Sequence, residues 1–387
     1  MIRLIIMTDF TEQYASRLLR GILRYSRETE PWSICKMPPE YKRTNGIRGV
    51  VEWAKRWQAD AIIGQFEPSD EVSLFQKAGI IVIAQDYKQR FDTITNITSD
   101  YRLAGRKAAV FYLSKGFRNF AFYGYDHVVW SDERFEGFRD YLFENGHALH
   151  LRDYRMQSIE EHWHYRSERL ADWLLTLPRS TALFAADDTM ASKIVEQCNA
   201  IKLNIPMDIC VLGVDNDEIA CQITYPELSS ITMDVERAGY ETGKAIHQMK
   251  NEHLSRISDI YVHYVGIVER SSTDYFAAHN PYIRKALIYI HTHLAHRMTV
   301  HDILRQIPMS RRLFELKFRE ETNTTPHNYI VTLRMERLSK MLLTTDESIE
   351  DLAMMVGIDD PKNLSRQFKA RKGMTPIEFR KKFAAES

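Results

Sequence analysis

Residues 310–330 read SRRLFELKFREETNTTPHNYI, and residues 360–379 read DPKNLSRQFKARKGMTPIEF. A single offset of fifty residues aligns the two stretches over their apolar positions and over the Thr-Pro pair that follows. The sequence therefore predicts one structural unit that occurs twice. The aligned pairs are Phe314 with Leu364, Phe318 with Phe368, Thr325 with Thr375, Pro326 with Pro376, and Tyr329 with Phe379.

Each copy has the pattern of two helices joined by a tight turn. In the first copy TVHDILRQ predicts a short helix, PMS a turn, and Ser310 the N-cap of a second helix. In the second copy IEDLAMMV predicts the first helix, and Asp360 is the expected N-cap with Pro361 at the favoured first helical position. The apolar spacing of TPHNYIVTLRMERLSKMLL predicts one helix between the copies. We therefore expect an all-α domain with two helix-turn-helix units.

The outward stripe of each second helix combines cations with hydrogen-bonding groups. A helix-turn-helix places its second helix in the major groove, where Arg pairs with guanine and Asn or Gln with adenine. A charged, solvated helix surface would explain one stripe alone, but the same pattern in two copies favours DNA binding. The candidate DNA-binding residues are Arg311, Arg312, Glu315, Leu316 and Arg319 in the first copy and Lys362, Asn363, Ser365, Arg366 and Lys369 in the second.

Charge is distributed unevenly along a chain whose formal net charge is zero. Residues 280–387 contain 19 Lys and Arg against 13 Asp and Glu, so the repeat region is basic and the remainder acidic. This asymmetry indicates a polyanion as partner, although a solvated basic surface gives the same count. No apolar run approaches the roughly 20 residues of a membrane helix, so no membrane partner is expected. The apolar run in MIRLIIMTDF is too short for a secretory signal and no small-residue cleavage site follows it, which predicts a cytoplasmic protein.

The cysteines do not indicate a metal or redox site. Their spacing includes no CxxC pair, and no histidine cluster accompanies them. We therefore expect buried thiols and no metal or cofactor. The cysteines are Cys35, Cys198, Cys210 and Cys221.

The first 273 residues alternate short apolar runs with helical stretches. The runs include LIIM, AIIG, IIVIA, NFAFYG, ALFAA and CVLGV, and stretches such as YASRLLRGILRYSRE lie between them. Near-continuous apolar strands separated by amphipathic helices are typical of parallel sheets covered on both faces. We expect an α/β domain over residues 1–273, a linker over 274–281 and the helical domain over 282–387.

Polar residues follow the predicted strands, at the sheet edge where ligands bind in parallel α/β folds. Carboxylates there can accept hydrogen bonds from the hydroxyls of a sugar, while an aromatic ring covers its apolar face. Any one Asp can instead cap a helix, as Asp188 ahead of TMASKIVEQ would, but their recurrence favours binding. The candidate ligand-binding residues are Asp9, Tyr14, Asp86, Trp130, Arg134, Asp187, Asp188 and Asp215.

The segments VLGVDND with PELSSITMD, ALFAADDTMAS, and LAGRKAAVFYLSKGFRNFAFYG resemble the effector-binding domain of LacI/GalR-type repressors, which is related to periplasmic sugar-binding proteins. The resemblance covers residues 2–273. It implies two lobes, each with a twisted parallel sheet, that close on an effector about a hinge. It also implies effector contacts at Asp86, Arg134, Asp187 and Asp215. Such repressors carry their DNA-binding headpiece before this domain, whereas this sequence starts with the predicted first strand.

The segment SIEDLAMMVGIDDPKNLSRQFKARKGMTPIEFR resembles the DNA-binding domain of the AraC/XylS family, and the resemblance covers residues 282–383. The first copy departs from that pattern. Leu304 stands where a small Ala is usual at the helix crossing, and Pro308 replaces the usual turn glycine. A larger residue at the crossing should push the two helices apart, so the docking angle of the first copy stays open.

The order of a LacI-type sensor before an AraC-type domain resembles regulators of the xylose type. This resemblance implies a cytoplasmic transcription factor that binds a double-stranded DNA operator, responds to a small sugar, a pentose such as D-xylose, and acts as a homodimer. RNA polymerase is a candidate further partner. Two alternatives stay open, a regulator that responds to a nucleobase or another metabolite and an enzyme that acts on a sugar.

Overall fold

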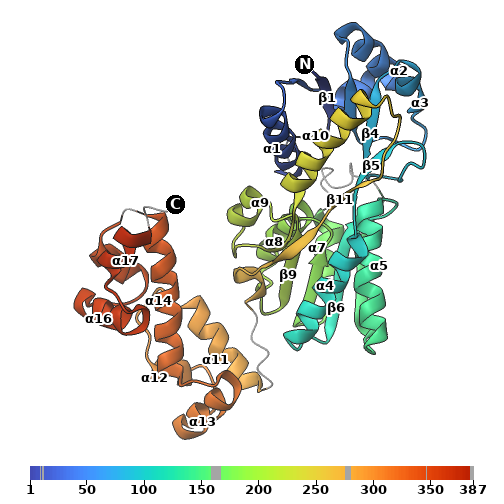
Figure 1. Ribbon diagram of the computed structural model, residues 1–387. Coiled ribbons are helices and arrows are strands. Elements are labelled where there is room, and N and C mark those ends of the chain that lie inside the picture. Colours follow the sequence, from blue (N-terminus) through green and yellow to red (C-terminus); the bar gives the residue numbers. More distant parts are fainter. Residues whose placement is uncertain (9, 11–12, 158–166, 275–279, 346, 384–387) are drawn as a thin grey trace. The chain divides into compact units, whose positions relative to one another are not determined.

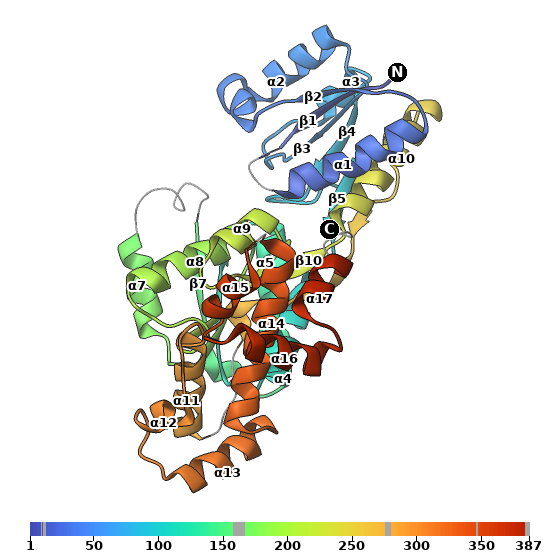
Figure 2. The ribbon, with the colours of Figure 1, turned by 90° about the vertical axis from the view of Figure 1, so that its left-hand side faces the viewer.

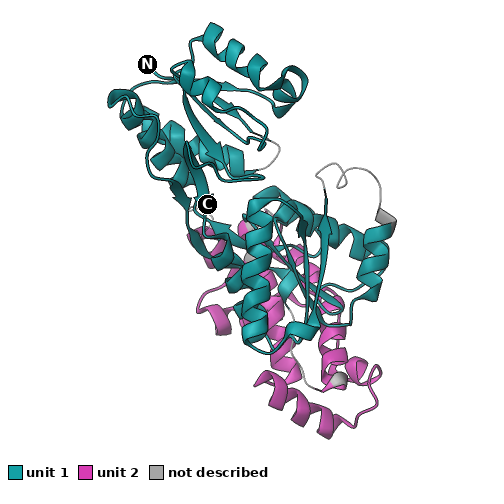
Figure 3. Cartoon of the chain, turned by 90° about the vertical axis from the view of Figure 1, so that its right-hand side faces the viewer, with its two compact units in different colours: residues 1–275 teal, residues 276–387 magenta. Residues whose placement is uncertain are grey.

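The computed structural model describes residues 1–8, 10, 13–157, 167–274, 280–345 and 347–383. The chain divides into two compact units, Met1–Tyr275 and Phe276–Ser387 (Figure 3). In the part of the chain that the structure describes, no helix is both long and apolar enough to span a membrane.

The first lobe of the N-terminal unit is a six-stranded parallel sheet with the order β11-β5-β4-β3-β1-β2 (Figure 2). Alternate residues of β1 face opposite sides of this sheet. Leu4 and Ile6 pack in one core with α1 and α10, and Ile5 and Met7 pack in another with α2 and α3. The elements are β1 Arg3–Met7, β2 Ser33–Lys36, β3 Ala61–Gly64, β4 Ile81–Gln85, β5 Thr95–Ser99, β11 Ile260–Val262, α1 Gln13–Glu28, α2 Pro39–Trp57, α3 Ser73–Lys77 and α10 Val235–Asn251.

The second lobe has the strand order β12-β10-β9-β8-β6-β7, in which β12 runs antiparallel to β10 and the other neighbours are parallel. The chain passes between the lobes from β5 to α4, from β10 to α10 and from β11 to β12 (Figure 1). The predicted two-lobed, parallel α/β architecture is therefore confirmed. The elements are β6 Asn119–Tyr125, β7 Leu151–Met156, β8 Thr181–Ala185, β9 Ile209–Val214, β10 Ser229–Met233, β12 Tyr264–Val268, α4 Tyr101–Ser114, α5 Val129–Glu144, α7 Ser167–Thr176, α8 Asp188–Ala200, α9 Glu218–Ile223, η1 Ala148–His150 and η2 Ser271–Thr273.

The C-terminal unit is helical and contains both predicted helix-turn-helix copies. The first copy consists of α12 and α13 and the second of α15 and α16. Ser310 and Asp360 cap α13 and α16, as the sequence predicted. The elements are α11 Pro281–Thr292, α12 Val300–Leu304, α13 Arg311–Thr322, α14 Pro326–Thr344, α15 Ile349–Met355, α16 Pro361–Lys372 and α17 Pro376–Phe383.

Helix α14 joins two separate hydrophobic cores. Ile330 packs with the core of the first copy, and the adjacent Val331 packs with the core of the second. In Figure 1, α11, α12 and α13 lie toward one end of α14 and α16 and α17 toward the other. The helix therefore fixes the spacing of the two copies, because one rigid element contributes to both cores.

All four cysteines are free thiols, three of them buried and Cys35 partly buried. Burial raises the pKa of the Cys198 thiol to about 12. Because the thiolate is the nucleophilic and metal-binding form, this thiol is inert at neutral pH. Among the residues that the structure describes, no three His, Cys, Asp or Glu side chains are grouped as a metal site requires.

Candidate functional site

Asp86 follows β4 in the first lobe, and its side chain is almost fully buried, with 1% of the residue exposed. Thr98 Oγ1 donates a hydrogen bond to Asp86 Oδ2 over 2.6 Å, and Arg90 Nε donates to the same oxygen over 2.9 Å. The second oxygen, Oδ1, has no hydrogen-bond partner among the described residues. Burial raises the pKa of Asp86 to about 6, although the contacts with Thr98 and Arg90 act in the opposite direction.

Arg134 lies on α5 of the second lobe and is only 4% exposed. Its Nη1 donates to the backbone carbonyl of Ala186, and its Nη2 lies 3.4 Å from Asp215 Oδ1. The guanidinium carbon is 5.4 Å from the ring centroid of Trp130 and 5.4 Å from that of Tyr101. Arg134 Nε is buried without a hydrogen-bond partner among the described residues. The guanidinium group is thus held in place while one donor stays unpaired.

Two adjacent carboxylates at the end of β8 have different surroundings. Asp187 is the N-cap of α8 and accepts from the Met190 backbone N–H over 2.7 Å, and burial raises its pKa to about 6. Asp188 is the first helical residue, so the cap is Asp187 and the capping interpretation of Asp188 is wrong by one position. Its two oxygens accept from Ser230 Oγ over 2.6 Å and from the Asp217 N–H over 2.7 Å. Asp188 therefore stabilises the strand ends of the second lobe from within.

Asp215 follows β9 with a backbone φ of 95°, a conformation that residues other than glycine rarely adopt. Its carbonyl accepts from Arg17 Nη1 of the first lobe over 2.9 Å, while its carboxylate faces Arg134. Tyr14 of α1 is partly buried, and burial together with the charges of Asp215 and Asp86 raises its pKa. Strained backbone persists where the surrounding structure fixes it, and such positions cluster at functional sites.

The structure thus brings Asp86 and Tyr14 of one lobe toward Arg134 and Asp215 of the other. A second interlobe contact is bidentate. Arg90 Nη1 and Nη2 donate to the two carboxylate oxygens of Glu133 on α5 over 2.6 and 2.9 Å. Asp9 lies outside the described residues.

The sequence did not predict several further residues of this interlobe site, namely Arg17, Arg90, Thr98, Tyr101 and Glu133. Tyr101 follows the end of a strand, β5, as Asp86, Asp187 and Asp215 follow the ends of theirs. The sequence did not predict β5 as a strand, because its residues TNITS are mostly polar. Arg90 and Arg17 act across the lobes, and sequence spacing carries no information about such contacts.

The candidate DNA-binding residues lie on α13 and α16, and on α16 Lys362, Arg366 and Lys369 are exposed whereas Asn363 and Ser365 are half-buried. The predicted residues of α13 are all exposed, and Arg311 Nε donates to Glu315 Oε1 over 2.8 Å. On α16, Arg366 Nη2 donates to Asn363 Oδ1 over 3.0 Å. Arg366 itself stays exposed. The cations are therefore accessible to a polyanion, while Glu315 is engaged by its own helix.

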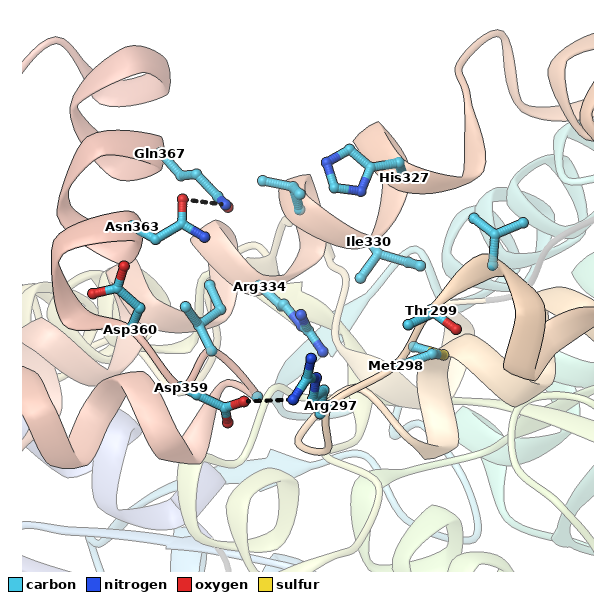
Figure 4. Close-up of a pocket in the computed structure, with 14 residues that line it drawn as sticks. Arg297, Met298, Thr299, His327, Ile330, Arg334, Asp359, Asp360, Asn363 and Gln367 are labelled. Carbon is cyan, nitrogen blue, oxygen red and sulfur yellow. Dashed lines mark hydrogen bonds and ion pairs between the residues drawn. The ribbon is translucent and has the colours of Figure 1, made fainter.

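A pocket lies at the seam between the two copies, and residues from both copies line it (Figure 4). Arg334 of α14 points into this seam and is only 8% exposed. Its Nε donates to the Leu294 carbonyl over 3.3 Å and its Nη2 to the His296 carbonyl over 2.6 Å. Residues 294 and 296 lie between α11 and α12. The sequence did not predict a role for Arg334. Its hydrogen bonds connect α14 to the segment that precedes α12 of the first copy.

Comparison with known proteins gives the two domains independent support. A family model described as a periplasmic binding protein-like domain matches residues 109–273. A second model, described as a helix-turn-helix domain, matches residues 303–382. Both matches fall within the units in which the structure has the corresponding folds.

Relatives match almost the whole chain. The xylose operon regulatory protein of Haemophilus influenzae is 29% identical, over 98% of each chain. The protein of that name from Escherichia coli K12 is 26% identical, over 98% of this chain and 96% of that relative. A solved structure described as the xylose-binding transcription activator xylR has a TM-score of 0.77 and 25% identity, over 98% of this chain and 97% of that one.

These relatives are transcription regulators and not enzymes, which removes the sugar-acting enzyme from the alternatives. Their similarity to this chain extends over nearly its full length and so includes both of its domains. The chain is thus a transcription regulator in which a periplasmic-binding-protein-like domain precedes a helix-turn-helix DNA-binding domain, and it is similar over nearly its full length to xylose operon regulatory proteins.

Proposed function

We propose that this regulator binds a pentose such as D-xylose between the lobes of its N-terminal unit and binds operator DNA through α13 and α16. One observation carries the sugar part of the proposal. Asp86 Oδ1 and Arg134 Nε are an acceptor and a donor on side chains less than 5% exposed, and neither has a partner among the described residues. Buried polar atoms are rarely left unpaired, so a ligand that supplies both a donor and an acceptor fits this pair.

A sugar hydroxyl supplies a donor and an acceptor in one group. Asp215, Asp187 and Tyr14 add further acceptors and a ring at the same interlobe site, and the rings of Trp130 and Tyr101 beside Arg134 offer apolar surface. The names of the full-length relatives favour xylose among sugars of this class.

The sugar proposal is tested by thermal unfolding with a panel of D-xylose, L-arabinose, D-ribose, D-glucose and purine bases. A ligand at 100 times its Kd adds about 2.7 kcal/mol to the stability of the native state, which gives a clear shift in Tm. Asp86→Asn keeps the shape of the side chain and removes its charge, and we expect it to weaken pentose binding at least tenfold. Asp172→Asn, on the exposed surface of α7, is the matched control and should bind as the wild type does.

Three outcomes separate the alternatives. A shift with a pentose that Asp86→Asn weakens supports the proposal. A shift with a purine alone would replace it by a nucleobase-responsive regulator. Equal pentose affinity in Asp86→Asn and in the wild type would show that the pentose does not bind at this interlobe site.

The DNA part of the proposal predicts a strong dependence on salt. If the C-terminal unit neutralises about six phosphates, the logarithm of the binding constant should fall with the logarithm of salt concentration with a slope of about −5. Fluorescence anisotropy with duplex DNA at several salt concentrations measures this slope. Binding that does not change with salt would contradict a phosphate-binding role for the exposed cations of α13 and α16.

The same proposal includes a homodimer that works in the cytoplasm and, as an activator, contacts RNA polymerase. Sedimentation with and without D-xylose tests the dimer. Transcription in a purified system with RNA polymerase, operator DNA and the regulator tests the contact with polymerase. A monomer at all concentrations, or repression alone, would contradict these parts separately.

A further inference from the structure

The second helices of the two copies, α13 and α16, which we call the recognition helices, have similar buried residues and different exposed residues. Helices α13 and α16 align at the offset of fifty residues, so that buried Phe314 and Phe318 correspond to buried Leu364 and Phe368. Leu316 lies two residues from each of the two phenylalanines, which places it on the opposite side of α13. At the aligned position of α16 the residue is Arg366.

The neighbouring outer position shows the same contrast. Leu313 is three residues from Leu316, so the two side chains are neighbours on the helix surface. They are 44% and 55% exposed, and neither belongs to the hydrophobic core of its copy. The residue aligned with Leu313 is Asn363. An apolar pair in the first copy thus stands where the second copy has an amide and a guanidinium.

The polar pair of α16 is already organised. Asn363 Oδ1 accepts from Arg366 Nη2 over 3.0 Å and from Gln367 Nε2 over 3.2 Å, and the second of these bonds is drawn in Figure 4. One oxygen therefore orients two donors, and Arg366 stays exposed with its remaining N–H groups. An Arg held in this way suits guanine, whose O6 and N7 accept two parallel hydrogen bonds in the major groove.

The apolar pair of α13 requires another base. Among the base edges in the major groove, the thymine C5 methyl is the apolar group. Exposed Arg312 and Arg319 border the leucines on the same outer surface, and such cations bind the phosphates on either side of the groove. The occupant that fits an apolar pair bordered by cations is therefore a thymine-containing segment of duplex DNA.

We propose that the two copies read different bases: α13 reads thymine methyl groups through Leu313 and Leu316, and α16 reads guanine through Arg366. This inference rests on the proposed DNA-binding function and specifies the operator. The operator has a thymine-bearing box for the first copy and a guanine-bearing box for the second.

The experiment begins with selection of duplexes from a random library by the full-length chain, with and without D-xylose. In the selected duplex, deoxyuridine replaces each thymine in turn and removes only its methyl group. In a parallel series, 7-deazaguanine replaces each guanine and removes only its N7 acceptor. We expect the affinity to fall about fourfold for each methyl that a leucine covers and at least fivefold for the N7 that Arg366 contacts.

Variants assign each effect to a helix. Leu316→Ala should reduce the deoxyuridine effect to less than twofold and leave the 7-deazaguanine effect unchanged, and Arg366→Ala should do the reverse. Leu343→Ala removes an exposed leucine of α14 and is the control that should change neither. The double variant Leu313→Asn, Leu316→Arg gives α13 the residues that α16 has at the aligned positions and should select guanine in place of thymine.

The outcomes are distinct. Loss of affinity with deoxyuridine that disappears in Leu316→Ala supports the inference. The inference is wrong, although DNA binding itself is not contradicted, in either of two cases. The wild type binds the selected duplex equally well with deoxyuridine at every thymine, or the loss of affinity with deoxyuridine is as large in Leu316→Ala as in the wild type. A failure to enrich any sequence under either condition would instead contradict the proposed DNA-binding function.

Discussion

The two helix-turn-helix copies share a core and differ in their turns. The ring centroids of Phe318 and Tyr329 are 5.5 Å apart at an interplanar angle of 78°, and those of the aligned Phe368 and Phe379 are 5.4 Å apart at 84°. The first helix of the first copy, α12, has five residues, whereas the first helix of the second copy, α15, has seven. The two copies thus share this packing and differ in the segments around it.

The turns explain part of this divergence. In the second copy Gly357 has a φ of 75°, and a Cβ there would lie 2.8 Å from the carbonyl oxygens of Leu294 and His296. Only glycine fits such a turn without displacing its neighbours. The first copy has Pro308 in its turn, and proline has a fixed negative φ. A shared core therefore does not impose a shared turn, and the predictions below test which parts of the two copies are equivalent.

The largest expected effect tests the equivalence of the cores. Phe318→Ala and Phe368→Ala each remove a fully buried ring and should cost about 3 to 5 kcal/mol, with similar values for the two copies. Far-UV circular dichroism during denaturation measures this loss. All six tryptophans precede residue 174, so tryptophan fluorescence reports the N-terminal unit and should keep its transition. Costs that differ by more than about 2 kcal/mol would show that one core dominates the stability of the domain.

The second prediction compares two glycines that share a φ of 75°. A Cβ at Gly373 would meet nothing within 4 Å, so Gly373→Ala should cost only the left-handed conformation, about 1 kcal/mol. Gly357→Ala adds the close approach to backbone carbonyls and should cost roughly 2 to 4 kcal/mol. The same denaturation experiment measures both variants. Equal costs would mean that the Leu294 and His296 carbonyls can move away from the added Cβ without a cost in free energy, which would contradict this prediction.

The third prediction tests the connection between the copies. Arg334→Met keeps an apolar stem and leaves the Leu294 and His296 carbonyls without their donor, which should cost about 1.5 to 3 kcal/mol. Arg337→Met, at an exposed position of the same helix, is the control and should change stability by less than about 0.5 kcal/mol. DNA binding by Arg334→Met should weaken most on duplexes that engage both copies. An equal loss on duplexes that engage one copy would contradict this role in spacing.

Much of the fold followed from patterns that depend on local chemistry. The sequence predicted the repeat at an offset of fifty residues, the caps at Ser310 and Asp360 and the apolar strands. Strands β2, β5, β7 and β10 were not, because sequences such as TNITS and LRDYRM contain polar residues. In β5 those polar side chains are buried and bonded to distant residues. Thr98 donates to Asp86, for example, and Thr95 donates to the Ile257 carbonyl.

The candidate interlobe site was predictable only in part for a related reason. Strand ends identified Asp86, Asp187 and Asp215, since parallel strands place their carboxyl ends at one edge. The cations that connect the lobes, Arg17 and Arg90, reach across from other elements and have no periodic signal. The wrong assignment of the cap at Asp188 arose because two adjacent aspartates offer the same chemistry. They are distinguished in the structure by the extended backbone of Asp187 and by their different hydrogen-bond partners.

The smallest expected effect concerns the ends of the recognition helices. The C-cap residue that follows α13 is Asn323, with a φ of 56°, and the C-cap residue that follows α16 is the aligned Gly373, with a φ of 75°. Glycine adopts this conformation without the steric cost that a side chain adds, and Asn bears that cost better than other residues. Asn323→Gly should therefore stabilise the domain by less than about 1 kcal/mol, and Gly373→Asn should destabilise it by a similar amount. Denaturation midpoints of the two variants and of the double exchange measure the difference. A double exchange that matches the wild type would show that the two caps are equivalent, whereas a net loss would show that each cap is adapted to its own copy.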